Sequence, residues 1–231
     1  MPVAKKKCKK NNKKRPTSPV LSILFSISKK VFYIDCMPKV GNKTFNSKNP
    51  SYNACVGNNG GATDRTYASG YKDSVEILLN VVLDGGCILD RLVYPIAYNA
   101  RHYVELSLKS TLESLRLICK SRRLQCQVSG LRGHSLKKLM DEVKRLSSID
   151  PVYKEVVTEL EGYVSDYYEV DDSAETFRFS KSHDGKKHLE DRDCIGLIGF
   201  AENFAKMSEL LEWLDTINVL LLDYEAQRNV E

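Results

Sequence analysis

Residues 88–121 read ILDRLVYPIAYNARHYVELSLKSTLESLRLICKS and predict one long helix. Its apolar side chains fall on several sides of that helix, which is typical of a helix buried at the centre of a bundle. Pro95 either bends the helix or lies in its first turn, depending on where the helix begins. The segment therefore predicts a mainly helical domain built around it.

Apolar side chains at spacings of three and four predict further helices on both sides of this segment. The first begins near Tyr71, and Gly85 with Gly86 ends it. Another follows Ser135, a suitable N-cap. A third starts at Asp150 and Pro151, because proline is tolerated in the first turn. The last begins at Leu197. The apolar positions are Val75, Leu78, Leu79 and Val82, then Leu136, Leu139, Met140, Val143 and Leu146, then Val152, Val156, Leu160 and Val164, and finally Leu197, Phe200, Phe204, Met207, Leu211 and Leu214.

The rest of the chain has a different composition. Residues 20–35 are rich in β-branched and aromatic residues and predict two short strands. Residues 37–70 are rich in Asn, Gly, Ser and Lys, which is typical of a loop. A short strand is also predicted at Phe177–Phe179 and a turn at Asp184–Gly185. We expect a tail over 1–19, short strands and a long loop over 20–69, and a helical bundle over 70–231.

The positive charge of the chain is concentrated at its start. The whole sequence carries 35 basic and 30 acidic residues, and residues 1–19 hold eight of the basic residues and no acid. Subtracting these eight leaves 27 basic residues against 30 acidic ones. Such a segment is too polar to fold alone, so we expect a disordered tail. It either binds phosphate backbones as a nucleic-acid arm or acts as a solubilising or targeting tail.

Residues 20–28 are apolar and follow the basic start, but the run is short and Lys29 and Lys30 close it. No other stretch is long enough to span a membrane. The seven cysteines show neither a paired motif nor zinc-ligand spacing, so we expect reduced thiols, no metal and no cofactor. These features predict a protein of the cytoplasm that does not contact a membrane. The cysteines are Cys8, Cys36, Cys55, Cys87, Cys119, Cys126 and Cys194.

Candidate functional residues cluster on the long helix. Neighbouring turns carry the polar side chains of Tyr98, Arg101, His102, Glu105 and Lys109. One interpretation is a polar pocket in which Glu105 orients His102 and Arg101 meets a phosphate. The alternative is an ion-pair network that ties neighbouring helices together.

His134 directly precedes a predicted helix. It either caps that helix or belongs to the same pocket. If the bundle brings His134 close to His102, the two imidazoles suit general acid and general base roles in phosphodiester cleavage.

Three stretches in order resemble the HEPN-like helical bundle family. They are YPIAYNARHYVEL at 94–106, GHSLKKL at 133–139 and FRF at 177–179, followed by the Asp184–Gly185 turn and a closing helix. The likeness covers roughly residues 70–220. It is closer to the uncharacterised bacterial branch associated with antiviral defence than to the well-defined toxins of toxin-antitoxin systems.

The resemblance implies a site and an activity. HEPN ribonucleases carry an Arg-x(4-6)-His motif that cuts RNA without metal at a dimer interface, using the 2′-hydroxyl of the substrate as nucleophile. Arg178 and His183 fit that spacing, which implies a catalytic role for them together with His102 and Arg101. Substrate would then contact Glu105, Lys109, His134 and Tyr98. Alternatively, Arg178 is a structural clamp that pairs with Glu105 or with Asp171 and Asp172.

Two functions of different classes follow. The first is a metal-independent endoribonuclease, in which RNA is expected more than DNA and the protein is a homodimer. The second is a non-catalytic HEPN-like subunit that binds nucleic acid, a nucleotide or a partner protein. A purely structural oligomer is a third possibility.

Overall fold

The computed structural model describes residues 54–56, 61–85, 88–128 and 132–228. Those residues form five α-helices and one 3₁₀ turn, and they contain no β-strand beyond one isolated bridge. The prediction of a mainly helical domain is confirmed. The basic segment 1–19 and the two strands predicted over 20–35 lie outside the described residues. The elements are α2 (Asp64–Gly85), α3 (Leu89–Ser121), α4 (Leu136–Ser147), η3 (Pro151–Tyr153), α5 (Lys154–Asp171) and α6 (Leu197–Arg228).

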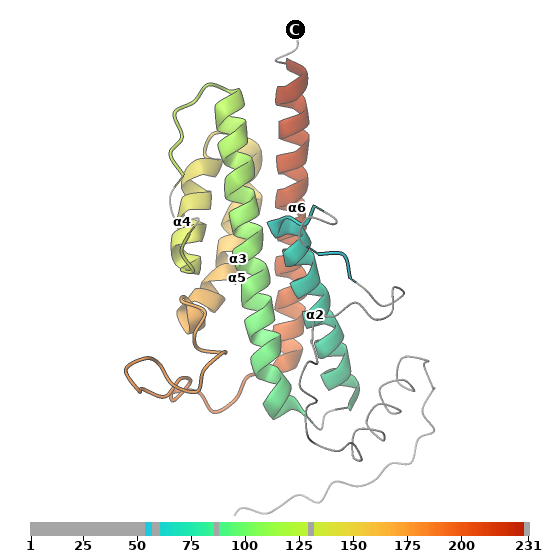
Figure 1. Ribbon diagram of the computed structural model, residues 1–231, viewed down its shortest axis with the longest axis vertical. Coiled ribbons are helices and arrows are strands. Elements are labelled where there is room, and N and C mark those ends of the chain that lie inside the picture. The colour runs from blue at the N-terminus through green and yellow to red at the C-terminus, as the bar shows by residue number, and fades with distance from the viewer. Residues whose placement is uncertain (1–53, 57–60, 86–87, 129–131, 229–231) are drawn as a thin grey trace, which may run out of the picture. The chain divides into compact units, whose positions relative to one another are not determined.

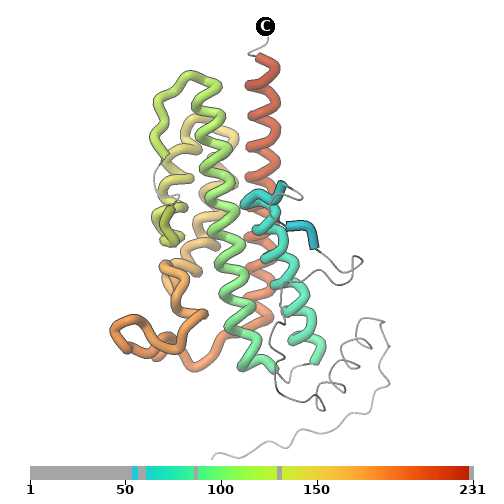
Figure 2. The backbone as a smooth tube through the Cα atoms, in the orientation of Figure 1, coloured from blue at the N-terminus to red at the C-terminus, as the bar shows by residue number. Residues whose placement is uncertain are grey.

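The long central helix predicted from residues 88–121 is α3. It contacts α2, α4, α5 and α6, and its buried residues lie on several sides (Figure 1). The helix starts at Leu89, so Pro95 lies inside it and not in its first turn. Figure 2 shows α2 running alongside the N-terminal half of α3. The central position of α3 explains why it carries apolar residues on several faces.

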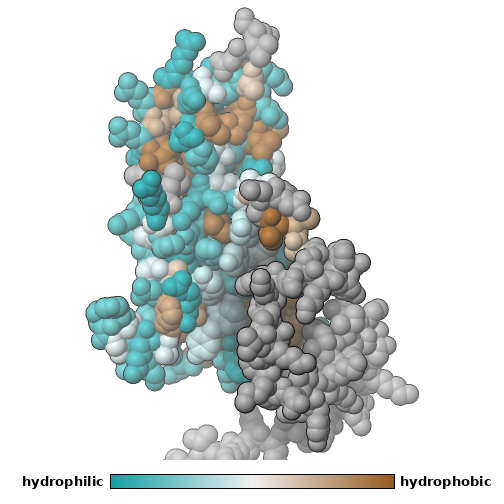
Figure 3. Space-filling view, viewed as in Figure 1, coloured by the Kyte–Doolittle hydropathy of each residue, from teal (hydrophilic) through white to brown (hydrophobic). Residues whose placement is uncertain are grey.

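The apolar stripes predicted for the neighbouring helices form the core. Val75, Leu139, Leu160 and Leu214 are among the fully enclosed side chains. One predicted core position is wrong, because the Val152 side chain is 49% exposed and Tyr153 is buried in its place. Both residues belong to the 3₁₀ turn η3, whose period of three residues differs from that of the α-helix used for the prediction. The visible face is mostly hydrophilic, with apolar residues gathered near the C-terminal ends of α3 and α6 (Figure 3).

The helix starts predicted at Ser135, Asp150 and Leu197 are confirmed, and the start of the first helix is displaced. The Ser135 hydroxyl accepts a hydrogen bond from the Lys138 amide at 3.2 Å, and the Asp150 carboxylate accepts one from the Val152 amide at 3.1 Å. However, α2 begins at Asp64 rather than near Tyr71. Residues 64–70 contain Gly70 and several polar residues, so their composition resembled a loop, but they continue the helix.

Residues 172–196, named here the α5–α6 connection, contain turns in place of the predicted strand. The strand expected at Phe177–Phe179 is wrong, because the amides of Arg178 and Phe179 both bond back to the Glu175 carbonyl, which closes a turn. The turn at Asp184–Gly185 is confirmed. Gly185 has a φ of 80°, which glycine adopts without strain, and its amide donates to the Ser182 carbonyl at 2.9 Å.

Two cysteines are joined in a disulfide, against the expectation of reduced thiols throughout. Cys119 ends the buried face of α3, and Cys126 follows in the loop, with 6.0 Å between their Cα atoms. The chain reverses at Arg123, whose φ of 58° brings the loop back along the helix. That reversal is not visible in cysteine spacing. A disulfide is uncommon in the cytosol, so this bond does not favour the predicted cytoplasmic location. Among the described residues no helix is both long and apolar enough to cross a membrane.

Candidate functional site

Glu105 of α3 is the centre of a buried polar cluster. Its carboxylate accepts hydrogen bonds from the Arg101 guanidinium, from Lys109 Nζ at 2.7 Å and from His134 Nδ1 at 2.9 Å. Lys109 and His134 bond to Oε1, whereas Arg101 bonds to Oε2, and His102 Nδ1 lies 3.8 Å from Oε2. These five residues are named here the Glu105 cluster. Both histidines that the sequence offered as an acid–base pair therefore lie against one carboxylate.

Helical geometry explains four members of the Glu105 cluster. Arg101, His102 and Lys109 lie one turn of α3 before or after Glu105, so their side chains meet it. His134 lies in the segment just before α4. Its contact with Glu105 depends on the packing of α4 against α3. The cap of α4 is Ser135, not His134, so the capping alternative for His134 is not what the structure shows.

Arg101 is fully buried and acts as a clamp between elements. Its Nε donates to the Asp171 carbonyl at 3.2 Å, and its Nη2 donates to the Asp172 carbonyl at 2.9 Å and to the His134 carbonyl. Nη1 bonds to Glu105. The guanidinium thus joins α3 to the end of α5 and to the start of α4. This matches the ion-pair alternative, and a phosphate cannot reach this guanidinium without displacing those partners.

The electrostatics of the cluster keep Glu105 ionised. Desolvation by burial acts to raise the pKa of this carboxyl. The neighbouring donors His102, Lys109 and Arg101 outweigh that effect, so the pKa of Glu105 lies well below its usual range. An ionised carboxylate only accepts hydrogen bonds, so His134 Nδ1 must carry the proton that it shares with Glu105.

The two histidines differ in exposure. The His134 side chain is 66% exposed, whereas that of His102 is 21% exposed. Within the described part of the chain, His134 Nε2 makes no hydrogen bond, and it is the ring nitrogen opposite the one held by Glu105. His134 is therefore an oriented imidazole with a ring nitrogen left for a ligand. This carboxylate–histidine arrangement is the one that general bases use.

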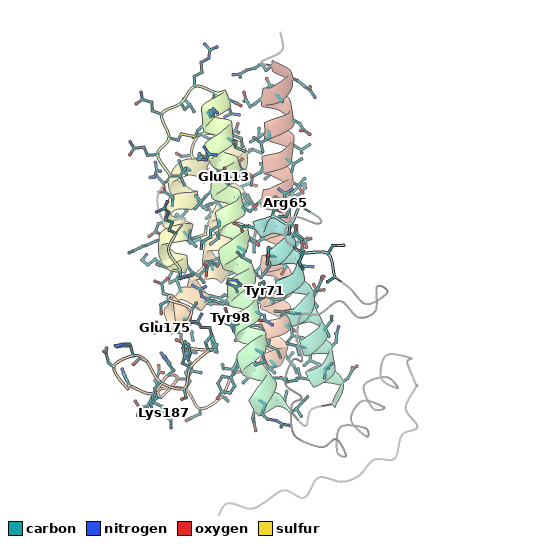
Figure 4. The ribbon with its side chains drawn as sticks, in the orientation of Figure 1. Arg65, Tyr71, Tyr98, Glu113, Glu175 and Lys187 are labelled. Atoms are coloured by element: carbon teal, nitrogen blue, oxygen red, sulfur yellow. A yellow bond between two sulfur atoms is a disulfide. The ribbon has the colours of Figure 1, made fainter. Side chains whose placement is uncertain are left out.

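Aromatic side chains surround His102. The Tyr98 ring stacks on the imidazole at 5.8 Å with an interplanar angle of 7°, and the Tyr71 ring meets it edge-on at 4.5 Å. Figure 4 shows Tyr71 on α2 and Tyr98 on α3. Tyr71 was not predicted as part of the site, because its contact with His102 joins two different helices.

Arg178 and His183, the pair implied by the family motif, have separate surroundings. The Arg178 guanidinium lies over the Tyr98 ring at 5.9 Å and over the Phe179 ring at 4.9 Å. The His183 side chain is 100% exposed, and its nearest ionic neighbour is Asp184 at 3.8 Å. Arg178 thus extends the Glu105 cluster through Tyr98 and His102, while His183 lies at the turn of the α5–α6 connection.

The alternative partners suggested for Arg178 bond to other groups in the described part of the chain, although Asp171 Oδ2 has no hydrogen-bond partner there. Glu105 binds the groups described above. The Asp171 carboxylate accepts from the amides of Glu175 at 2.8 Å and Thr176 at 3.1 Å, and Asp172 accepts from the Lys137 amide at 2.8 Å. Within the described residues Arg178 forms no ion pair with these carboxylates, so the structure does not show the clamp. Its contacts are aromatic.

Comparison of the chain with protein-family models, with curated proteins and with solved structures yields no match in any of the three. The described residues also contain no group of three or more His, Cys, Asp or Glu side chains placed to hold a metal ion.

Proposed function

We propose that the chain is a HEPN-like, nucleic-acid-directed protein of a toxin or antiviral defence system and that it cleaves RNA without a metal ion. The observation that carries this proposal is the exposed His134 imidazole, held at 2.9 Å by the buried Glu105 carboxylate. His102 lies against the same carboxylate and Lys109 beside it. Two imidazoles and a cation can supply the general base, the general acid and the charge stabilisation that favour phosphodiester cleavage by a 2′-hydroxyl.

In the proposed reaction His134 is the general base and His102 is the general acid. His134 Nε2 takes the proton of the ribose 2′-hydroxyl, and the 2′-oxygen attacks the adjacent phosphorus. The bond from phosphorus to the 5′-oxygen then breaks, and protonated His102 donates a proton to that leaving oxygen. The products are a 2′,3′-cyclic phosphate and a free 5′-hydroxyl. Lys109, which bonds to Glu105, and Arg178, which lies over the Tyr98 ring, are the cations that we assign to the negative charge developing on the phosphate.

The same mechanism indicates the substrate. DNA lacks the 2′-hydroxyl, so only RNA can be cut in this way. The basic segment over residues 1–19 supports nucleic acid as the ligand. A homodimer, as implied by the family resemblance, would place two such sites on one RNA.

A second candidate is a non-catalytic HEPN-like subunit that binds nucleic acid or a partner protein. Two observations favour it. Arg101 is enclosed by backbone carbonyls and Glu105, and Arg178 and His183 have unrelated neighbours. In this case the Glu105 cluster is purely a structural clamp between helices.

Cleavage assays on the full chain separate the two candidates. Labelled RNA and the matching DNA are incubated with protein in EDTA. We expect cleavage of RNA alone, with 2′,3′-cyclic ends, and a loss of about 10²-fold or more in His134→Asn and His102→Asn. His183→Asn, purified in the same way, is the matched control and should cleave like the wild type. Absent cleavage, or equal cleavage by all four proteins, supports the non-catalytic candidate.

A further inference from the structure

The α5–α6 connection and the end of α5 enclose a cleft of about 590 Å³ that the proposed cleavage does not use. Glu175 and Lys187, labelled in Figure 4, lie in that connection. The walls carry both cations and hydrogen-bond acceptors. The residues that matter here are Glu169, Ser182, Lys187, His188, Glu190 and Arg192.

A second, smaller pocket of about 130 Å³ adjoins the cleft, because Val170 and Arg192 line both. Its walls are mainly apolar and include three aromatic side chains. The rings of Tyr167 and Phe200 meet edge-on at 6.1 Å, and Phe177 completes the apolar lining. Asp166 and Asn203 supply polar groups at the same pocket. Together the two spaces form a binding region with an aromatic end and a charged end.

The polar wall contains a side-chain atom without a partner. His188 Nε2 is buried and has no hydrogen-bond partner within the described residues, although the His188 amide is bound to the Ser180 carbonyl at 3.1 Å. A buried imidazole nitrogen without a partner loses the hydrogen bond that water would give. A ligand in the cleft could supply that bond.

We propose that this region binds a nucleoside monophosphate. The planar base fits the aromatic pocket, where Asn203 and Asp166 can bond to its polar edge. The phosphate fits the cleft, where Lys187, Arg192 and His188 can donate to it. Glu169 and Glu190 serve as acceptors for the ribose hydroxyls, as acidic residues do in dinucleotide sites. A single phosphate suits these walls better than a chain of phosphates, because the carboxylates would repel additional negative charge.

This chemistry has two sources, a free mononucleotide or the phosphorylated end of an RNA strand. The site does not depend on cleavage by the Glu105 cluster. Neither notable residue of the cleft, His188 or Arg192, was singled out from the sequence, because both lie in a polar stretch that resembles a solvated loop.

Calorimetric titration of the full chain tests the proposal. The probes are AMP, GMP, CMP and UMP, their 2′-deoxy forms, inorganic phosphate, and a short RNA with and without a 5′-phosphate, the RNA being titrated into His134→Asn to prevent cleavage. We expect at least one ribonucleotide to bind, its deoxy form to bind more weakly, and Arg192→Ala and Phe177→Ala to raise Kd at least ten-fold. Arg116→Ala, an exposed arginine of α3 far along the chain, is the control and should leave Kd unchanged.

The outcomes are decisive in each direction. The site is supported if free mononucleotides bind, or if 5′-phosphorylated RNA binds more tightly than unphosphorylated RNA, and if both variants weaken that binding at least ten-fold. Which of the two probes binds identifies the source. No nucleotide binding, binding of inorganic phosphate as tight as that of any nucleotide, or binding that Arg192→Ala leaves intact overturns it. If His134→Asn still binds nucleotide, the nucleotide site stands independently of the cleavage proposal, even if no RNA is cleaved.

Discussion

The Arg101 guanidinium donates a hydrogen bond to the backbone carbonyl of His134, the residue that we propose as general base. Glu105 binds the guanidinium of the first residue and the imidazole of the second. The structural clamp and the candidate site therefore share one carboxylate. Arg101 acts on the proposed chemistry as a positioning residue, because it is buried and holds the backbone that carries His134.

Replacing Arg101 with methionine should destabilise the fold strongly. The change takes the guanidinium away from the buried Glu105 carboxylate and removes one hydrogen-bond donor from each of three backbone carbonyls. Breaking a buried ion pair on one side costs roughly 3–5 kcal/mol. Urea unfolding followed by circular dichroism measures the loss. Arg116→Met is the matched control, since that residue also pairs with a glutamate of α3 but is exposed. Equal stability of the two variants would contradict the clamp.

Much of the bundle could be predicted from sequence because it depends on local periodicity. The apolar spacing of α4 and α6 and the caps at Ser135 and Asp150 are properties of neighbouring residues, and all were confirmed. The prediction that Val152 is buried was wrong because a 3₁₀ turn changes the helical period at that point. The predicted start of α2 was wrong because the glycine and polar residues before Tyr71 do not interrupt the helix.

The candidate site could be predicted only as far as one helix reaches. The spacing along α3 indicated that Arg101, His102, Glu105 and Lys109 would meet. Whether Arg101 faces solvent or the core depends on the carbonyls of Asp171 and Asp172, some 70 residues later in the chain. Contacts of that kind, like the edge-on contact of Tyr71 with His102, arise from tertiary packing and leave no periodic signal.

Glu105→Gln should make stability less dependent on acid pH. The pKa of Glu105 in the folded state is well below its ordinary value of 4.5, so its stabilisation is fully present above about pH 4.5 and is lost as pH falls through the folded-state pKa. The stability difference between wild type and variant should be largest at pH 7 and should shrink toward pH 3. Urea titrations at pH 7, 5, 4 and 3 test this.

The control for Glu105 is another glutamate of α3. Glu113 also has a lowered pKa, first because of its hydrogen bond with Arg116, but both partners are exposed. Glu113→Gln should therefore change stability little at any of these pH values. A difference for Glu105→Gln that stays constant from pH 7 to pH 3 would show that its charge is not the cause.

Removal of residues 1–19 should weaken RNA binding and its dependence on salt. That segment carries eight basic residues, and each phosphate contact on a single strand contributes about 0.7 to the slope of log K against log salt. The slope should fall by up to about 6. Fluorescence anisotropy at several salt concentrations measures it. A variant of full length with the eight residues changed to serine distinguishes charge from length. An unchanged slope would leave the segment as a solubilising or targeting tail.

Cys126→Ser should lower stability under oxidising conditions. The disulfide from Cys119 closes a short loop, with a sequence separation of 7, and cross-links of that length stabilise by roughly 2–3 kcal/mol in the chain-entropy account. Arg122 lies inside this loop, and its guanidinium bonds to Asp150 at 2.9 Å and to Glu225 of α6 at 2.7 Å. Loosening the loop should therefore also speed amide hydrogen exchange in the last turns of α6. Wild type in reducing agent should match the variant, while Cys194→Ser, which removes an exposed thiol, should match oxidised wild type. Alkylation of both Cys119 and Cys126 without reductant would show that the bond is absent in solution.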